Sequence, residues 1–153
     1  MLFRSYASLL TGQKRYGEAV ELYRKSLNLR IQMLGEDHPQ TANAFLGLGN
    51  ALIETEDYEE AEEKLIRGLE AYKLKLPTDH WNISYSESLL GKCYLREGKY
   101  ERAEKILLKA YDNLLNKRGS NDRLTISTLK TLIKNYELWG KSNRADKYKG
   151  IVK

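Results

Sequence analysis

Three segments of the chain decide its fold, because they repeat one pattern at a fixed spacing. They read RYGEAVELYRKSL at residues 15–27, DYEEAEEKLIRGL at residues 57–69 and KYERAEKILLKAY at residues 99–111. Their shared tyrosines and alanines recur at steps of 42 residues, and the alanines continue into a fourth copy: Tyr16, Tyr58 and Tyr100, with Ala19, Ala61, Ala103 and Ala145. A period of this length indicates an array of similar supersecondary units.

Two further sets of residues keep the same register. One set lies upstream of the tyrosines: Leu48, Leu90 and Leu132, with Gly49 and Gly91. The other set marks the joints between units, where LGEDHPQTA at 34–42 returns as LPTDHWNIS at 76–84 and as RGSNDRLTI at 118–126. Three independent sets in one register make a chance match untenable.

The apolar spacing within each unit is helical. Ala61, Leu65, Leu69 and Tyr72 fall at i, i+4, i+8 and i+11, which predicts a helix with one apolar face. The small residues at Gly49 and its equivalents predict a close approach of two helices within a unit. We predict first helices over 2–12, 40–54, 82–96 and 123–139, and second helices over 16–33, 57–75, 99–117 and 142–151, with N-caps at Asp37, Asp79 and Asn121.

These elements predict an all-α fold, a right-handed superhelical solenoid of about four antiparallel helix pairs. We expect a single domain over residues 1–153, with repeats at about 1–34, 40–76, 82–118 and 123–153. Each pair is expected to contact mainly its neighbours.

The pattern in Gln13–Ala19 and Gly98–Ala103 resembles the tetratricopeptide repeat, a helix-turn-helix unit. The 42-residue period and the joint LGEDHP resemble the longer subtype found in kinesin light chains and in many bacterial proteins. This resemblance covers essentially the whole chain and implies a non-catalytic module that binds a peptide or a partner helix.

The last two units also resemble the C-terminal tail of bacterial serine/threonine protein kinases, through LPTDHW at 76–81 and YELWGKSNRADKY at 136–148. The Gly-rich loop, the VAIK lysine and the HRD and DFG segments of a kinase are absent from this sequence. An alternative function is therefore a regulatory or scaffolding tail of such a kinase. Because Met1 falls inside the first predicted helix, we expect a fragment of a longer array.

Composition argues against several other classes of protein. The mean hydropathy is −0.63, and no apolar run approaches the roughly 18 residues of a membrane span. The single cysteine, Cys93, cannot form an internal disulfide, so we expect a cytoplasmic protein. His38 and His80 occupy the same position of successive joints, which favours a role at helix starts. Cys93 is expected to be a packed thiol, so we predict no catalysis, no metal and no cofactor.

The charge is unevenly distributed. The whole chain carries +5, but residues 116–153 hold ten Lys or Arg against three Asp or Glu, so the remainder sums to −2. The basic end makes nucleic-acid binding a weaker alternative. Most of the eleven tyrosines are expected in the core, at Tyr16, Tyr58, Tyr94, Tyr100 and Tyr136. The acidic cluster is expected to be a solvated helix start: Glu56, Asp57, Glu59, Glu60, Glu62 and Glu63.

The tetratricopeptide resemblance implies that first helices line a concave groove. The groove positions carried over from that family are Arg4, Asn43, Leu46, Asn50, Tyr85, Ser88, Lys92, Arg96, Lys130 and Lys134. Basic and amide side chains dominate this set, which indicates a preference for acidic, extended peptides, although a merely solvated groove is equally compatible with it. Asn50 and Lys92 resemble part of a two-carboxylate clamp, whose other basic positions are here Tyr85 and Leu89.

The first helix is expected to leave apolar side chains uncovered. They are Leu2, Phe3, Tyr6, Leu9 and Leu10. Exposed apolar patches usually have a partner, so we predict either end-to-end self-association or a preceding repeat that covers them.

Overall fold

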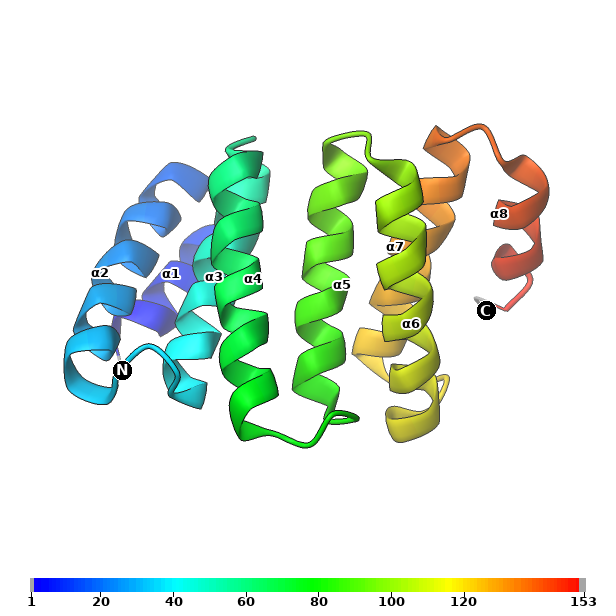
Figure 1. The fold of residues 1–153 in the computed structure, drawn as a ribbon. Coiled ribbons are helices and arrows are strands. Elements are labelled where there is room, and N and C mark those ends of the chain that lie inside the picture. Colours follow the sequence, from blue (N-terminus) through cyan, green and yellow to red (C-terminus); the bar gives the residue numbers. More distant parts are fainter. Residues whose placement is uncertain (1, 152–153) are drawn as a thin grey trace. The chain divides into compact units, whose positions relative to one another are not determined.

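The computed structural model describes residues 2–151, and the side chains of residues 5–151. Over this range the chain forms eight α-helices and no strand (Figure 1). They are α1 (Leu2–Gly12), α2 (Tyr16–Leu34), α3 (Pro39–Glu54), α4 (Tyr58–Lys75), α5 (Trp81–Arg96), α6 (Tyr100–Arg118), α7 (Arg123–Leu138) and α8 (Ser142–Lys149). The prediction of an all-α fold built from four helix pairs is confirmed, and every predicted boundary lies within two residues of the observed one.

The chain divides into two compact units, Met1–Thr78 and Asp79–Lys153. Unit 1 contains the pairs α1/α2 and α3/α4, and unit 2 contains α5/α6 and α7/α8. Within each unit the second helix of one pair packs on the first helix of the next, α2 on α3 and α6 on α7. The two first helices of a unit also contact each other, α1 with α3 and α5 with α7. Each unit therefore places its first helices side by side.

Glycines bring the two helices of a pair together. A Cβ atom on Gly49 would lie 2.6 Å from Leu65 Cγ, and one on Gly91 would lie 2.5 Å from Leu107 Cγ. Both distances are too short for any carbon–carbon contact, so only glycine fits between these helices as they stand. The predicted close approach is confirmed, and leucines four residues after the repeat alanines supply the main contact.

Helix starts use a different residue from the one predicted at each joint. The N-caps are His38, His80 and Asp122, one residue later than the predicted Asp37, Asp79 and Asn121. The Nδ1 atoms of His38 and His80 accept hydrogen bonds from the backbone N–H of Gln40 and Asn82, at 3.1 and 3.2 Å. The cap prediction was wrong because each joint offers two neighbouring side chains that can cap, Asp and His at the first two joints and Asn and Asp at the third, and the second of them makes the bond. The helix-start role predicted for both histidines is confirmed.

The tyrosine and cysteine predictions are confirmed in part. Tyr94, Tyr136 and Cys93 are buried. Tyr16, Tyr58 and Tyr100 are only half-buried, and each is the first residue of a second helix, next to the turn of its pair. Among the described residues, no helix is long and apolar enough to cross a membrane.

The core of unit 2 is more polar than that of unit 1. Its buried polar side chains are Ser84, Ser86, Glu87, Thr125, Thr128 and Asn135, whereas unit 1 buries Ser26 and Thr41. Glu87 on α5 is 3% exposed and accepts a hydrogen bond of 2.6 Å from Lys109 Nζ on α6. Phe45 and Leu129 stand at the repeat position of Glu87, one repeat before it and one repeat after it, and both are buried. The fold therefore accommodates an apolar side chain at this position.

Replacing this buried carboxylate is a direct test of the polar core. We expect Glu87→Leu to leave the free energy of unfolding unchanged or to raise it by about 1–4 kcal/mol, because desolvation of a buried charge usually cancels the attraction of its partner. Urea unfolding followed by circular dichroism measures the change. A clear loss of stability would show that the Glu87–Lys109 pair stabilises the fold.

Candidate functional site

The predicted groove residues fall into both units. Asn43, Leu46 and Asn50 lie on α3 in unit 1. The remainder lie in unit 2, on α5 and α7: Tyr85, Ser88, Lys92, Arg96, Lys130 and Lys134. The side chain of Arg4 lies outside the described residues.

Leu46 does not belong to an exposed surface. Its side chain is 2% exposed, and a Cβ on Gly68 of α4 would lie 2.8 Å from Leu46 Cδ2. Leu46 therefore packs inside the α3/α4 pair and is not part of an exposed binding surface. Asn43 and Asn50 on the same helix are half-buried.

Leu10 was also predicted to be exposed and is not. It is 1% exposed and belongs to the core. Tyr6 and Leu9 are 51% and 53% exposed, as predicted. The side chains of Leu2 and Phe3 lie outside the described residues.

Unit 2 brings the other six candidate residues onto two contacting helices. We call this set the α5–α7 face: Tyr85, Ser88, Lys92, Arg96, Lys130 and Lys134. Arg96, Lys130 and Lys134 are exposed, and Tyr85, Ser88 and Lys92 are half-buried. The Oγ atom of Ser88 lies 2.8 Å from Oγ1 of Thr128, so a hydrogen bond links α5 to α7.

The 42-residue register shows which residues of α5 and α7 occupy equivalent repeat positions. Lys134 follows Lys92 by 42 residues, whereas Lys130 follows Ser88 by 42. Thr128, the partner of Ser88, was missed by the sequence analysis. It is 1% exposed, and no feature of its repeat position distinguishes it from a core residue.

The carboxylate of Glu137 lies beside this face. Glu137 Oε2 is 4.0 Å from Lys134 Nζ, and Glu137 Oε1 is 3.0 Å from Lys149 Nζ of α8. The hydrogen bond to Glu137 holds the pKa of Lys149 above its ordinary value. Glu137 is thus shared between Lys134 of the α5–α7 face and Lys149 of α8.

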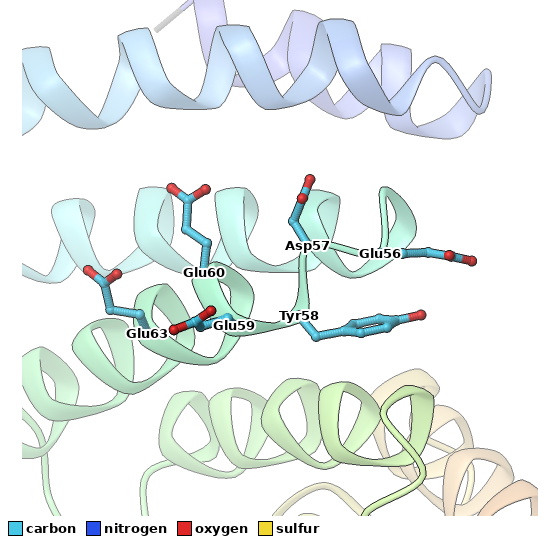
Figure 2. Close-up of a pocket in the computed structure, with 6 residues that line it drawn as sticks. All are labelled: Glu56, Asp57, Tyr58, Glu59, Glu60 and Glu63. Carbon is cyan, nitrogen blue, oxygen red and sulfur yellow. The ribbon is translucent and has the colours of Figure 1, made fainter.

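Five residues of the acidic cluster, all but Glu62, line a cavity of about 540 Å³ at the start of α4, together with Tyr58 (Figure 2). Glu60 points towards α2, where Arg24 donates two hydrogen bonds to its carboxylate at 2.5 and 2.6 Å. These bonds lower the pKa of Glu60. Figure 2 shows the side chains of Glu56 and Tyr58 directed away from Glu63. Within the described residues, no three acidic, histidine or cysteine side chains are grouped to hold a metal ion. The cluster matches the predicted solvated helix start.

A third charged feature is the cap of α7. Asp122 Oδ1 accepts hydrogen bonds from the backbone N–H of Leu124 and Thr125, and Oδ2 lies 2.9 Å from Arg118. The Arg118 side chain, followed by these backbone donors, lowers the pKa of Asp122. The ionised carboxylate thus ties the end of α6 to the start of α7.

This cap predicts a pH dependence of stability. A carboxyl group with a lowered pKa in the folded state stabilises the fold above its unfolded pKa of about 3.9 and loses that effect as the pH falls through the folded value. We expect Asp122→Ala to lower the melting temperature at pH 7 and to lower it much less at pH 3. Asp122→Asn keeps a side chain that can cap the helix, so it is expected to lower the melting temperature at pH 7 by less than Asp122→Ala does. Thermal unfolding of each variant is measured at both pH values. Equal decreases in the melting temperature of Asp122→Ala at pH 7 and pH 3 would contradict a stabilising role of the ionised carboxylate.

Comparison with known proteins identifies the repeats. Models of the tetratricopeptide repeat match residues 1–73 and residues 88–121. No curated protein matches the sequence. The resemblance of the last two units to kinase tails stays a prediction.

Solved structures share the fold. A Podosopora anserina protein with nearly identical TPR-like repeats of the kinesin light chain type aligns with a TM-score of 0.77 and 19% identity, over 98% of this chain and 71% of that one. BtubC (BKLC) from P. vanneervenii aligns with a TM-score of 0.82 and 21% identity, over 97% and 61%. The apo form of RapI aligns with a TM-score of 0.74 and 22% identity, over 95% and 39%.

These likenesses agree with the four helix pairs and with the 42-residue register of the sequence. The fold is one that usually serves as a non-catalytic scaffold for protein interactions, and no catalytic family is indicated. The chain belongs to the tetratricopeptide repeat family, with repeats like those of kinesin light chains.

Proposed function

We propose that the chain is a protein-interaction module whose α5–α7 face binds an acidic peptide in an extended conformation. The observation that carries this proposal is the gathering of four basic side chains, Lys92, Arg96, Lys130 and Lys134, on two helices that contact each other. Unit 2 as a whole has sixteen Lys or Arg against nine Asp or Glu, whereas unit 1 has ten against twelve. The surplus of positive charge thus lies in the unit that holds the face.

The chemistry of the face suits carboxylates of a peptide. Arg96 can form a two-pronged hydrogen bond with a carboxylate, and the lysines act as mobile point charges. Tyr85 and Ser88 are neutral and half-buried, so they can contact the peptide between its charged side chains. A ligand that crosses two neighbouring helices reaches more of these groups when it is extended, because each residue of an extended chain advances by about 3.3 Å.

An unbiased peptide-display screen with the purified chain tests this function. We expect the selected peptides to be rich in Asp and Glu, and their affinity to fall as salt is raised, because exposed charges are screened. Selection of basic or purely apolar peptides would contradict the proposal. So would tight binding of single-stranded RNA in preference to the selected peptides.

A further inference from the structure

Helix α3 of unit 1 is almost completely enclosed. Between Thr41 and Ile53 every residue is buried except Asn43, Gly47 and Asn50, which are half-buried. These three residues stand at i, i+4 and i+7, so they form one ridge along the helix. The ridge is the part of this stretch that a ligand can reach, and it consists of two amide side chains and a glycine.

The 42-residue register gives the matching ridge of α1. Ser5 and Ser8 stand 42 residues before Gly47 and Asn50, and both are exposed. The two helices contact each other, so the two ridges belong to adjoining helices. We call the five residues the α1–α3 face: Ser5, Ser8, Asn43, Gly47 and Asn50. All of its side chains are uncharged.

Tyr23 of α2 explains the glycine in this face. A Cβ on Gly47 would lie 2.5 Å from Cε1 and 2.9 Å from Cδ1 of Tyr23, so the ring lies directly against the bare backbone. The phenol oxygen of the same ring lies 3.1 Å from Oγ of Ser8, which joins α3 to α1 through one side chain. Their mutual hydrogen bond uses one of the two hydroxyl hydrogens, so the pair can donate the other.

The later repeats do not share this arrangement. Leu65 and Leu107 stand at the repeat position of Tyr23, and Leu89 and Thr131 stand at the position of Gly47. A side chain therefore covers the middle of the ridge in unit 2. The exposed main chain and the hydroxyl pair are features of unit 1.

The first helices of the two units also differ in charge. α1 and α3 contain two charged residues of opposite sign, Arg4 and Glu54, whereas α5 contains three and α7 contains four. Lys92 and Lys134 occupy the repeat position of Asn50. The α1–α3 face therefore complements groups that are polar and uncharged.

Main-chain amides are the uncharged groups that suit this face. An asparagine side chain both donates and accepts, so it can pair with the N–H and the C=O of a peptide. The missing side chain at Gly47 allows a second backbone to approach closely. Asn43 and Asn50 are seven residues apart, which is about 10.5 Å along the helix axis and about three residues of an extended chain.

We infer that the α1–α3 face binds an uncharged, extended segment of a partner protein through the main chain of that segment. The segment lies along α3, with Asn43 and Asn50 paired to its peptide groups and its backbone against Gly47. The hydroxyl pair of Tyr23 and Ser8 donates a hydrogen bond to one of its carbonyl groups. This inference goes beyond the proposed function, because the face belongs to the other unit and requires no charge on the ligand.

The probe comes from a display library of ten-residue peptides without Asp, Glu, Lys or Arg. We expect the purified chain to select peptides from it, and their affinity to stay constant as salt is raised, because no pair of charges contributes. NMR shift changes are expected at Ser8, Asn43 and Gly47.

Contact with the main chain is measured on copies of the selected peptide that are N-methylated at one backbone nitrogen at a time. We expect methylation at one or two nitrogens to weaken binding roughly tenfold, because it removes a hydrogen-bond donor. Alanine at the same positions of the peptide keeps that donor and is expected to weaken binding less.

A double variant removes the two amides. We expect Asn43→Ala with Asn50→Ala to weaken probe binding roughly 10- to 100-fold, because each lost amide accounts for roughly a factor of 3 to 10. Asn28→Ala is the matched control, since Asn28 is exposed on α2 and lies outside the α1–α3 face. It should leave probe binding unchanged.

A second double variant covers the backbone at Gly47. Tyr23→Leu with Gly47→Leu introduces the residues that the next repeat has at these positions, and it removes the ring that a Cβ would meet. We expect the helix content to be kept and probe binding to fall at least roughly tenfold, because the new side chain keeps the peptide backbone away and the hydroxyl pair is lost.

Several results would overturn the inference. They are a screen that selects no peptide, binding that N-methylation leaves unchanged, and binding that survives the loss of both amides. Loss of the probe in Lys92→Glu with Lys130→Glu would place it on the α5–α7 face. Self-association that is lost in Asn43→Ala with Asn50→Ala would assign the α1–α3 face to a second copy. Because Lys92 and Lys130 lie in unit 2, the loss of acidic peptides on their reversal tests the proposed function independently.

Discussion

Gly91→Ala is expected to lower the free energy of unfolding by about 1–3 kcal/mol, although alanine is the better helix former. The added Cβ would lie 2.5 Å from Leu107 Cγ and 2.6 Å from Leu107 Cδ2, inside the contact between α5 and α6. Leu107 is fully buried and cannot turn aside without displacing its neighbours. The helices must therefore separate, and the loss of packing exceeds the gain in helix propensity.

Two further variants separate these causes. Gly17→Ala on α2 places a methyl group where nothing lies within 4 Å, so it is expected to raise the free energy of unfolding by about 0.5–1 kcal/mol. Leu107→Ala alone is expected to lower it by about 2–5 kcal/mol, through the cavity that it leaves. In the double variant the new methyl group occupies part of that cavity, so the two losses should not add. Additive losses in urea unfolding would contradict a direct contact between the two positions.

The fold could be predicted from the sequence because every pair repeats the same positions. A single period aligns the alanines, the glycines and the joints, so an error in one copy is corrected by the others. The caps were displaced by one residue because the joints read DH or ND, so each offers two adjacent candidates. The second residue makes the bond in every case, as His38 does at the first joint. The polar core of unit 2 was not predictable in this way, because Glu87 stands where the pattern places Phe45 and Leu129.

The candidate site was only partly accessible to sequence reasoning. The register identifies which residues lie on first helices, but it does not separate a position that faces solvent from one that faces the partner helix. Leu46 illustrates this, because it shares its repeat position with Ser88 and Lys130 and yet packs against Gly68.

Reversing the charge of Lys92 and Lys130 is expected to weaken the binding of acidic peptides roughly 30- to 1000-fold. Each contact of an exposed lysine with a carboxylate is worth about 0.2–1 kcal/mol, and a shielded one up to about 3 kcal/mol. Reversal removes that attraction and adds a repulsion of similar size, so the two positions together amount to about 2–4 kcal/mol. Fluorescence anisotropy with a peptide taken from the display screen measures the change.

The control must alter the net charge equally without touching the α5–α7 face. Lys73→Glu with Lys105→Glu does so, because both lysines are exposed on second helices. If binding depended only on the overall charge of the chain, both double variants would lose the peptide alike. If the arrangement of charges on α5 and α7 is what matters, the Lys92 and Lys130 variant alone loses it, and the difference between the two narrows as salt screens the exposed lysines. Since Lys130 is exposed and Lys92 half-buried, neither reversal should change the helix content, so lost binding would report on the surface and not on unfolding.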